Sequence, residues 1–112
     1  MSLDNGRKDI LLRQGIDQIF ENLSNSHRRL ILLLLKQGRI KTETDVMVRG
    51  GNNSTEAELA LIHNHLPRLD DAGYIEWERD SGDISKGPRF EEIEPLLELI
   101  ETHADELPAD WP

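Results

Sequence analysis

The chain has 112 residues, enough for one compact domain with a single hydrophobic core. It contains no cysteine, which excludes disulfides, thiolate metal sites and thiol catalysis. Its longest apolar run has six residues whereas a membrane span needs about 20, and its start has no signal-peptide pattern, so we expect a cytoplasmic protein without membrane contact.

The charge is acidic and unevenly distributed. There are 22 acidic and 13 basic residues, and only 4 of the basic ones are lysines, a composition typical of soluble proteins from organisms that accumulate salt. Residues 1–89 have a net charge of −1, whereas residues 90–112 have −8. This acidic C-terminal segment is interpreted as a solvated helix face and tail, with an interaction tail as the alternative.

The first part of the chain has the pattern of two helices. Residues 8–23 are predicted to be helical because their apolar side chains recur three or four residues apart. These side chains are Ile16, Ile19, Phe20 and Leu23. Ser24 or Asn25 can cap the next helix with a side-chain oxygen. That helix contains the run 30–35, which is apolar on all sides, so we expect it to be central and to end near Gly38.

A helix-turn-helix pattern follows. A short helix is predicted over 42–48, the glycines and asparagines of 50–54 indicate a turn, and a long helix is predicted over 54–72. The long helix has one apolar stripe that we expect to face the core. Its members are Leu59, Ile62, Leu66 and Leu69. Pro67 cannot bond to the His63 carbonyl and should bend the helix there without interrupting the stripe.

The last third of the chain is predicted to form a β-hairpin and a further helix. Ile75 and Trp77 point to one side of a strand, and residues 80–83 have the composition of a hairpin turn, so the hairpin is placed at 74–90. Apolar residues at helical spacing then predict a C-terminal amphipathic helix over 93–103.

The predicted fold is mainly α with a small β-hairpin. The order of elements matches a winged helix-turn-helix, with a three-helix core, a hairpin wing, and flanking N- and C-terminal helices. The helix-turn-helix spans 42–72 and the wing 74–90, within a single domain at 8–104. Residues 1–7 and 105–112 are predicted to be flexible ends.

Two segments resemble ArsR-like winged-helix repressors. They are LSNSHRRLILLLL, residues 23–35, and HLPRLDDAGYIEW, residues 65–77. The proline in HLPRL is more similar to a group of haloarchaeal winged-helix domains. The resemblance implies a DNA-binding regulator of transcription that acts by operator occupancy and whose flanking helices build a two-fold dimer. The chain departs from the family in its longer turn and in Glu56 and Glu58 at the start of the long helix.

Neither a metal site nor an enzyme is predicted. His63 and His65 point about 200° apart on a helix, so they cannot hold one metal ion together. His65 lies at the edge of the apolar stripe and is expected to be packed and hydrogen-bonded. No carboxylate pairs with a nucleophile in a catalytic pattern, and no phosphate-binding loop or small-molecule pocket is legible. No cofactor or catalytic residue is therefore assigned.

DNA binding is expected at the face of the long helix opposite its stripe. Asn64 can read an adenine edge, small apolar side chains can meet thymine methyls, and arginines can reach phosphate or guanine. The candidate DNA contacts are Arg49, Ala57, Leu61, His63, Asn64, Arg68, Arg79, Lys86 and Arg89. Taken singly, each arginine is better explained as a solvated surface charge than as a DNA contact.

An adaptor that binds protein instead of DNA is the alternative function. A net charge of −9 opposes phosphate binding in ordinary salt. Molar salt shortens the Debye length to about 3 Å, which screens distant repulsion. A positive stripe along the polar candidate contacts Asn64, Arg68, Arg79, Lys86 and Arg89 would favour DNA, whereas an acidic or apolar surface there would favour the adaptor.

A homodimer is expected because both flanking helices are amphipathic and the resemblance implies a dimer. The candidate interface residues are Ile10, Leu11, Ile93, Leu97 and Ile100. Burial of both helix faces within one monomer is the competing account.

Overall fold

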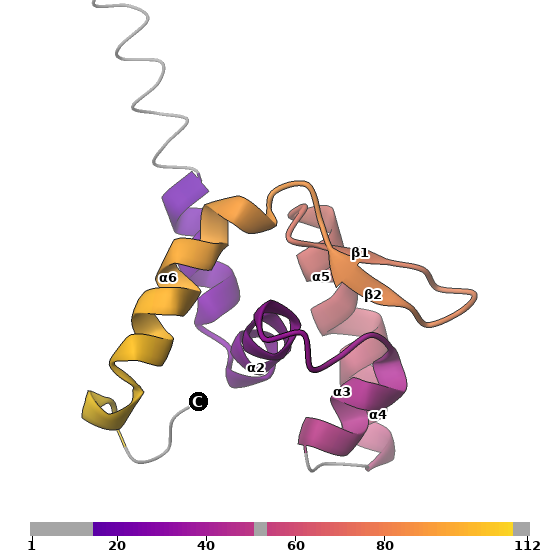
Figure 1. Cartoon of the computed structure of the whole chain (residues 1–112). Helices are drawn as coiled ribbons and strands as arrows, with labels where there is room; N and C mark the ends of the chain where they lie inside the picture. Colours follow the sequence, from indigo (N-terminus) through magenta and orange to yellow (C-terminus); the bar gives the residue numbers. More distant parts are fainter. Residues whose placement is uncertain (1–14, 51–53, 109–112) are drawn as a thin grey trace, which may run out of the picture.

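Helices make up most of the molecule, and one two-stranded hairpin projects from them (Figure 1). The computed structural model describes residues 15–50 and 54–108. The elements are a helix at residues 15–23, α2 (Ser26–Lys36), α3 (Glu43–Gly50), α4 (Thr55–Ala60), the π-helical turn η1 (Leu61–His65), α5 (Leu66–Asp71), β1 (Ile75–Trp77), β2 (Ile84–Lys86), α6 (Phe90–Thr102) and the 3-10 turn η2 (Ala104–Glu106). The predicted class, mainly helical with a small β-hairpin, is confirmed.

Helix α2 lies at the centre of the molecule, between α6 on one side and α3 and α4 on the other (Figure 1). Five consecutive apolar residues of this helix, 31–35, are buried, as its apolar run predicts. The Asn25 side chain caps it by accepting hydrogen bonds from two backbone N–H groups of the first turn. Gly38 follows the helix with φ of 71°, a left-handed conformation that favours glycine. The predicted cap and end of this helix are confirmed.

The predicted long helix forms, but a π-helical turn interrupts its regular winding. Helices α4 and α5 flank η1, and we call the three together the long helix. Pro67 has no N–H for the His63 carbonyl, and the Leu66 N–H reaches back five residues to the Leu61 carbonyl. The sequence predicted a bend at Pro67, and the structure has a π-helical turn directly before it.

The single apolar stripe predicted for the long helix is wrong at Leu59, the first of its four members. Ile62 is half-buried and packs against the core. Leu66 and Leu69 are fully buried as expected, but Leu59 is 51% exposed and Leu61 is only 4% exposed. The reason is the π-helical turn, which contains an extra residue and so shifts the phase of the helix by about one position. The buried face runs through Leu61, His65 and Leu66 before the proline and through Leu69 after it.

The hairpin forms where it is predicted, with Ile75 opposite Lys86 and Trp77 opposite Ile84 in an antiparallel pair. Ile75 and Trp77 are buried and Glu76 between them is exposed. The hairpin is also joined to the residues before α3, because the Ile84 N–H donates to the Lys41 carbonyl at 2.8 Å. This bond fixes the hairpin against the start of α3.

The base of the hairpin requires glycine at residue 87. A Cβ there would collide with the carbonyl oxygen of Gly73 and would lie 2.8 Å from the backbone nitrogen of Ile75. The two chain segments can approach this closely only because Gly87 has no side chain at the contact. The close approach connects the end of the long helix to the start of α6.

Helix α6 covers the core on the side opposite α3 and begins at Phe90, three residues before its predicted start. Pro95 therefore lies inside the helix, beyond its first turn. Similarly, α3 extends to Gly50, beyond its predicted end. Of the predicted flexible ends, residues 1–7 and 109–112 lie outside the described residues, and residues 104–106 form η2. No helix in the described part of the chain has the length and apolar character needed to cross a bilayer.

Candidate functional site

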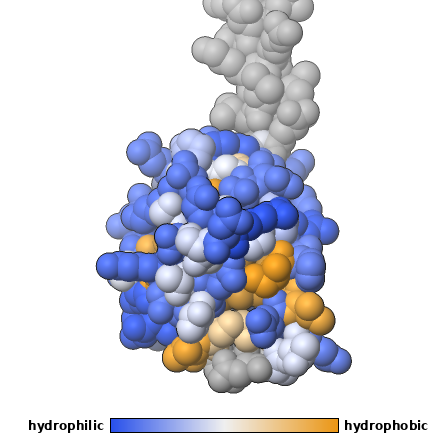
Figure 2. Space-filling view, turned by 90° about the vertical axis from the view of Figure 1, so that its right-hand side faces the viewer, coloured by the Kyte–Doolittle hydropathy of each residue, from blue (hydrophilic) through white to orange (hydrophobic). Residues whose placement is uncertain are grey.

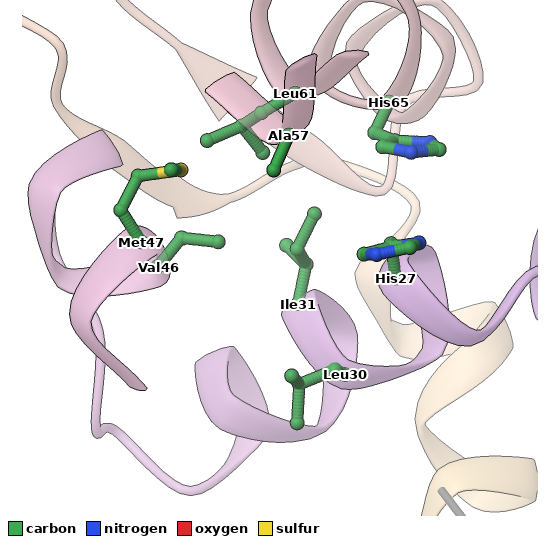
Figure 3. Close-up of a pocket in the computed structure, with 8 residues that line it drawn as sticks. All are labelled: His27, Leu30, Ile31, Val46, Met47, Ala57, Leu61 and His65. Carbon is green, nitrogen blue, oxygen red and sulfur yellow. The ribbon is translucent and has the colours of Figure 1, made fainter. Parts of the chain in front are cut away.

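The outer face of the long helix contains three of its five predicted DNA contacts. His63, Asn64 and Arg68 are exposed there. Leu61 is buried and Ala57 is half-buried, and their side chains point toward α2 (Figure 3). The expectation that these two meet a DNA groove is therefore wrong, because the phase shift at the π-helical turn places them on the inner face.

Arg68 is bonded to its neighbours within the chain. Its Nε donates to the Asn64 side-chain oxygen at 2.8 Å, and one terminal nitrogen lies 3.1 Å from a Glu21 carboxylate oxygen. All three side chains are exposed. An exposed pair of this kind contributes about 0–1 kcal/mol, so it neutralises the cation locally without fixing the helix.

The candidate cations of the hairpin are partly occupied by other contacts. The Arg79 guanidinium stacks over the Trp77 ring at 4.8 Å. The Lys86 ammonium lies 3.6 Å from a Glu94 carboxylate oxygen and 5.1 Å from the centre of the Phe90 ring. Arg49, by contrast, is exposed at the end of α3, away from the hairpin.

Arg89 connects three segments of the fold, so its predicted role as a phosphate contact is wrong. Its guanidinium donates to both carboxylate oxygens of Glu92 at 3.0 Å, to the Gln18 side-chain oxygen at 2.8 Å and to the Ala72 carbonyl at 3.1 Å. The bonded Glu92 raises the pKa of Arg89, and Arg89 lowers that of Glu92. With these donors engaged, Arg89 holds the first helix, α5 and α6 together.

The outer surface formed by the long helix and the hairpin is acidic. Its exposed carboxylates, within the described residues, are Glu56, Glu58, Asp71, Glu76, Glu78, Asp80 and Asp83. Its exposed arginine and lysine side chains are Arg68, Arg79 and Lys86, of which Arg68 and Lys86 are paired with carboxylates. The positive stripe that would favour DNA is not formed by these residues.

Two large apolar side chains are exposed on α3 and α4, and sequence reasoning missed both. Val48 is 68% exposed and Leu59 is 51% exposed. Figure 2, which looks onto this side of the molecule, shows a mostly hydrophilic surface with hydrophobic side chains toward its lower end. Val48 carried no sequence signal beyond its position near a turn, and Leu59 was assigned to the buried stripe.

The predicted dimer interface is only partly accessible. Ile93 and Leu97 are fully buried in the monomer core, so neither can meet a second copy. Ile100 packs against the same core and is half-buried, and Ile10 and Leu11 lie outside the described residues. For Ile93 and Leu97 the competing account, burial within one monomer, is correct. The flanking helices instead expose Ile16, Phe20 and Leu99.

The histidines form a stacked pair that the sequence did not predict. His65 is packed as expected, with 5% of its surface exposed, and its ring stacks on His27 with the ring centres 5.3 Å apart. The expected hydrogen bond is absent at Nδ1, which has no partner in the described part of the chain. No group of three metal-binding side chains occurs in residues 15–50 and 54–108.

A family model described as a domain of unknown function, DUF7344, matches residues 20–85. The match runs from the first helix to the second strand of the hairpin and covers more than half of the chain, while leaving out α6. Neither a curated protein nor a solved structure gives a significant match to the chain.

Proposed function

We propose that this chain, which belongs to the DUF7344 family, is a winged-helix module that binds another protein through the outer surface of its long helix and hairpin. The observation that carries the proposal is the charge of that surface. Its carboxylates outnumber its cations, and Arg68 and Lys86 are paired within the chain. Because neutralisation of phosphates supplies much of the affinity for DNA, this surface suits a protein partner with basic side chains better.

The order and joining of the elements support the winged-helix part of the proposal. Helices α2, α3 and the long helix are followed directly by the hairpin. The residues before α3 pair with the hairpin, since Thr42 and Asp83 form an antiparallel bridge. A hairpin joined in this way to the segment before α3 supports the proposed winged-helix plan.

The exposed apolar side chains support a protein partner. Val48 and Leu59 lie on the two helices of the proposed helix-turn-helix and are more than half exposed. Apolar groups surrounded by charged ones are the usual composition of a protein interface, with an apolar centre and a polar rim. We therefore expect the partner to contribute apolar side chains at Val48 and Leu59 and basic ones opposite the carboxylates.

Double-stranded DNA is the second candidate partner, and the Asn64–Arg68 pair favours it. Both side chains are exposed on the outer face of a helix, and the bond between them holds the Asn64 amide in place. Asparagine and arginine are the side chains that most often read adenine and guanine. Breaking the exposed ion pair between Arg68 and Glu21 costs about 0–1 kcal/mol, so a DNA phosphate can compete with Glu21 for Arg68.

Fluorescence anisotropy with genomic DNA fragments in molar KCl separates the two candidates. We expect no saturable binding, because the described carboxylates of the outer surface outnumber its cations and two of its three exposed cations are paired. Saturable binding that is lost in the double variant Arg68→Ala/Arg79→Ala would contradict the protein-binding proposal and support DNA. Arg89→Ala is unsuitable here because it would also disrupt the fold.

Cross-linking of the chain to its partner in molar KCl tests directly whether a protein binds at Val48 and Leu59. We expect a specific partner whose cross-links map near Val48 and Leu59, and whose capture is lost in Val48→Ser/Leu59→Ser. The matched control is Ile16→Ser, an exposed apolar residue on the opposite flank. Equal capture by all three proteins would show that Val48 and Leu59 are not part of the docking site.

We also propose that a second copy of the chain covers the exposed apolar side chains of the flanking helices. These are Ile16 and Phe20, four residues apart on one helix, and Leu99 on α6. Sedimentation in molar KCl tests this, with a dimer expected for the wild type and a monomer for Phe20→Ser. A wild-type monomer at all concentrations would contradict it.

A further inference from the structure

A small pocket lies between α2, α3 and the long helix (Figure 3). Ile31 of α2, Met47 of α3, and Ala57 and Leu61 of the long helix point toward one another around it. Its volume is about 50 Å³. Since one water molecule needs about 10–15 Å³ by this kind of measure, the pocket has room for about three to five non-hydrogen atoms.

The π-helical turn helps to form this pocket. Leu61 begins the turn and His65 ends it, and both line the pocket. The turn brings these two side chains to the inner face, where Leu59 would otherwise have been expected. Single π-helical turns within α-helices occur often at functional sites. Pro67, which disfavours regular winding here, thereby contributes to a cavity that it does not itself line.

His65 provides an unsatisfied polar group at the same place. Its side chain is buried, and Nδ1 has no hydrogen-bond partner among the described residues. Burial lowers the pKa of His65 to about 4, so the ring is neutral at pH 7 and offers one donor and one acceptor. An unmet buried polar atom costs about 1–3 kcal/mol, which a bonded ligand atom would recover.

The charges around the pocket limit the kind of ligand. Its described lining residues are apolar side chains and the two imidazoles of His27 and His65, with no arginine, lysine or carboxylate among them. An ion placed there would lose its hydration without gaining a partner, which is strongly unfavourable. The ligand should therefore be neutral.

We propose that this pocket binds a small neutral molecule with a branched aliphatic body of three or four carbons and one hydroxyl or carbonyl group bonded to His65. The aliphatic body lies among Ile31, Met47 and Leu61 (Figure 3). His27 is exposed and its ring stacks on that of His65, with an angle of 15° between the ring planes. Rotation of the His27 side chain would let the hydroxyl or carbonyl group of the ligand reach the buried His65 imidazole. This proposal does not depend on whether the outer surface binds protein or DNA.

Ligand binding would affect the outer surface, because the pocket walls come from helices that also form that surface. Met47 lies beside the exposed Val48 on α3, and Ala57 lies two residues from the exposed Leu59 on α4. A filled pocket holds α3 and α4 at a fixed separation. Without the ligand, the distance between the two helices can change. A ligand that binds more tightly at one of these distances than at the other then regulates partner binding.

Methyl NMR of the full chain tests the site with isobutanol as the probe. We expect saturable shifts of the Ile31 and Leu61 methyl signals. Two probes with the same branched four-carbon skeleton but a net charge, the anion isobutyrate and the cation isobutylammonium, should bind at least about tenfold more weakly because the pocket offers no counter-ion. Shifts that do not saturate, or equal binding of the charged probes, would overturn the proposal.

Variants of the lining residues locate the binding. Ala57→Leu should fill the pocket and abolish the shifts, whereas Ala60→Leu, the same change on the same helix outside the lining, should leave them unchanged. Met47→Ala should enlarge the pocket and permit binding of cyclohexanol, which keeps the test decisive if Ala57→Leu does not fold. His65→Phe should weaken isobutanol binding by about tenfold through loss of one hydrogen bond. Isobutanol shifts that persist in a folded Ala57→Leu, no gain of cyclohexanol binding in Met47→Ala, or unchanged affinity in His65→Phe would contradict the assignment.

Discussion

The two ends of the long helix are held in different ways. After Pro67, α5 contains the fully buried Leu69, and it is followed by Gly73, whose carbonyl oxygen lies close to Gly87. Before it, α4 has no buried residue at any of its six described positions, and Leu59 is 51% exposed. One end is anchored in the core, and the other lies over a small pocket. Segments with few buried contacts are the ones that open and adjust most readily, so we expect recognition and regulation to use α4.

Substitution at the anchored end should have the largest effect. Gly87→Ala places a Cβ against the Gly73 carbonyl and the Ile75 backbone, and neither neighbour can move without displacing the core. We expect the free energy of unfolding to fall by about 4 kcal/mol, as for severe overpacking or strain. Chemical denaturation measures it.

Gly38→Ala is the control for that substitution. Unlike Gly87, Gly38 has a positive φ, but nothing lies within 4 Å of the added Cβ, so only backbone strain of about 1–2 kcal/mol is expected. If Gly87→Ala and Gly38→Ala reduce the free energy of unfolding equally, the base of the hairpin is not tightly fixed.

A matched pair of leucines compares the two ends directly. Leu69→Ala removes a fully buried side chain and should cost about 3 kcal/mol, within the usual range for such cavities. Leu59→Ala removes a half-exposed side chain and should change stability by less than about 0.5 kcal/mol. Both are read from urea unfolding curves. A comparable loss at Leu59 would mean that α4 is anchored like α5.

The free energy of unfolding should decrease in acid because of His65, which lies between α4 and α5 of the long helix. Its pKa is lowered from 6.5 to about 4 by burial, with Arg28, Arg68 and His27 adding positive charge nearby. Between these values the unfolded chain binds a proton that the folded chain does not, so stability falls as the pH decreases from about 6.5 to about 4. The loss should approach about 3 kcal/mol and be complete below pH 4.

The variant His65→Phe isolates this contribution. Its stability should depend less on pH than that of the wild type across this range, because the carboxylates that also titrate there are present in both proteins. Thermal unfolding at several pH values provides the comparison. Parallel pH profiles would contradict a buried, neutral His65.

The smallest effect is expected for Arg68→Ala, on the outer face. The Arg68–Glu21 pair is exposed on both sides, and such pairs contribute little. Stability should change by less than about 0.5 kcal/mol in ordinary salt and by still less in molar KCl, where screening is strong. A larger loss would mean that this pair fixes the long helix to the first helix.

Local sequence patterns predicted most of the elements but could not predict how the faces of the helices are assigned. The central helix, its Asn25 cap and the hairpin follow from spacing and turn chemistry, which act within a few residues. The phase of the long helix could not be predicted that way. Spacing alone made Leu59 and Leu66 part of one stripe, but the π-helical turn shifts one relative to the other.

The site was harder to predict than the fold, because its properties depend on contacts between distant segments. Arg68 meets Glu21 across 47 residues and Arg89 meets Gln18 across 71, so neither pairing is visible in the local charge pattern. A single sequence shows which cations are present but not which are already paired. Similarly, the amphipathic C-terminal helix gave no indication that Ile93 and Leu97 pack inside the monomer.

The position of Arg89 has a consequence for the order of folding. Its bond to Gln18 closes a loop of 71 residues, whereas the bonds of the helices and the hairpin join nearby residues. Contacts between residues so far apart in sequence require a large loss of chain entropy, and they form after local contacts have restricted the chain. In refolding experiments the contact between Arg89 and the first helix should therefore form last, and Arg89→Ala should mainly accelerate unfolding while leaving the refolding rate nearly unchanged.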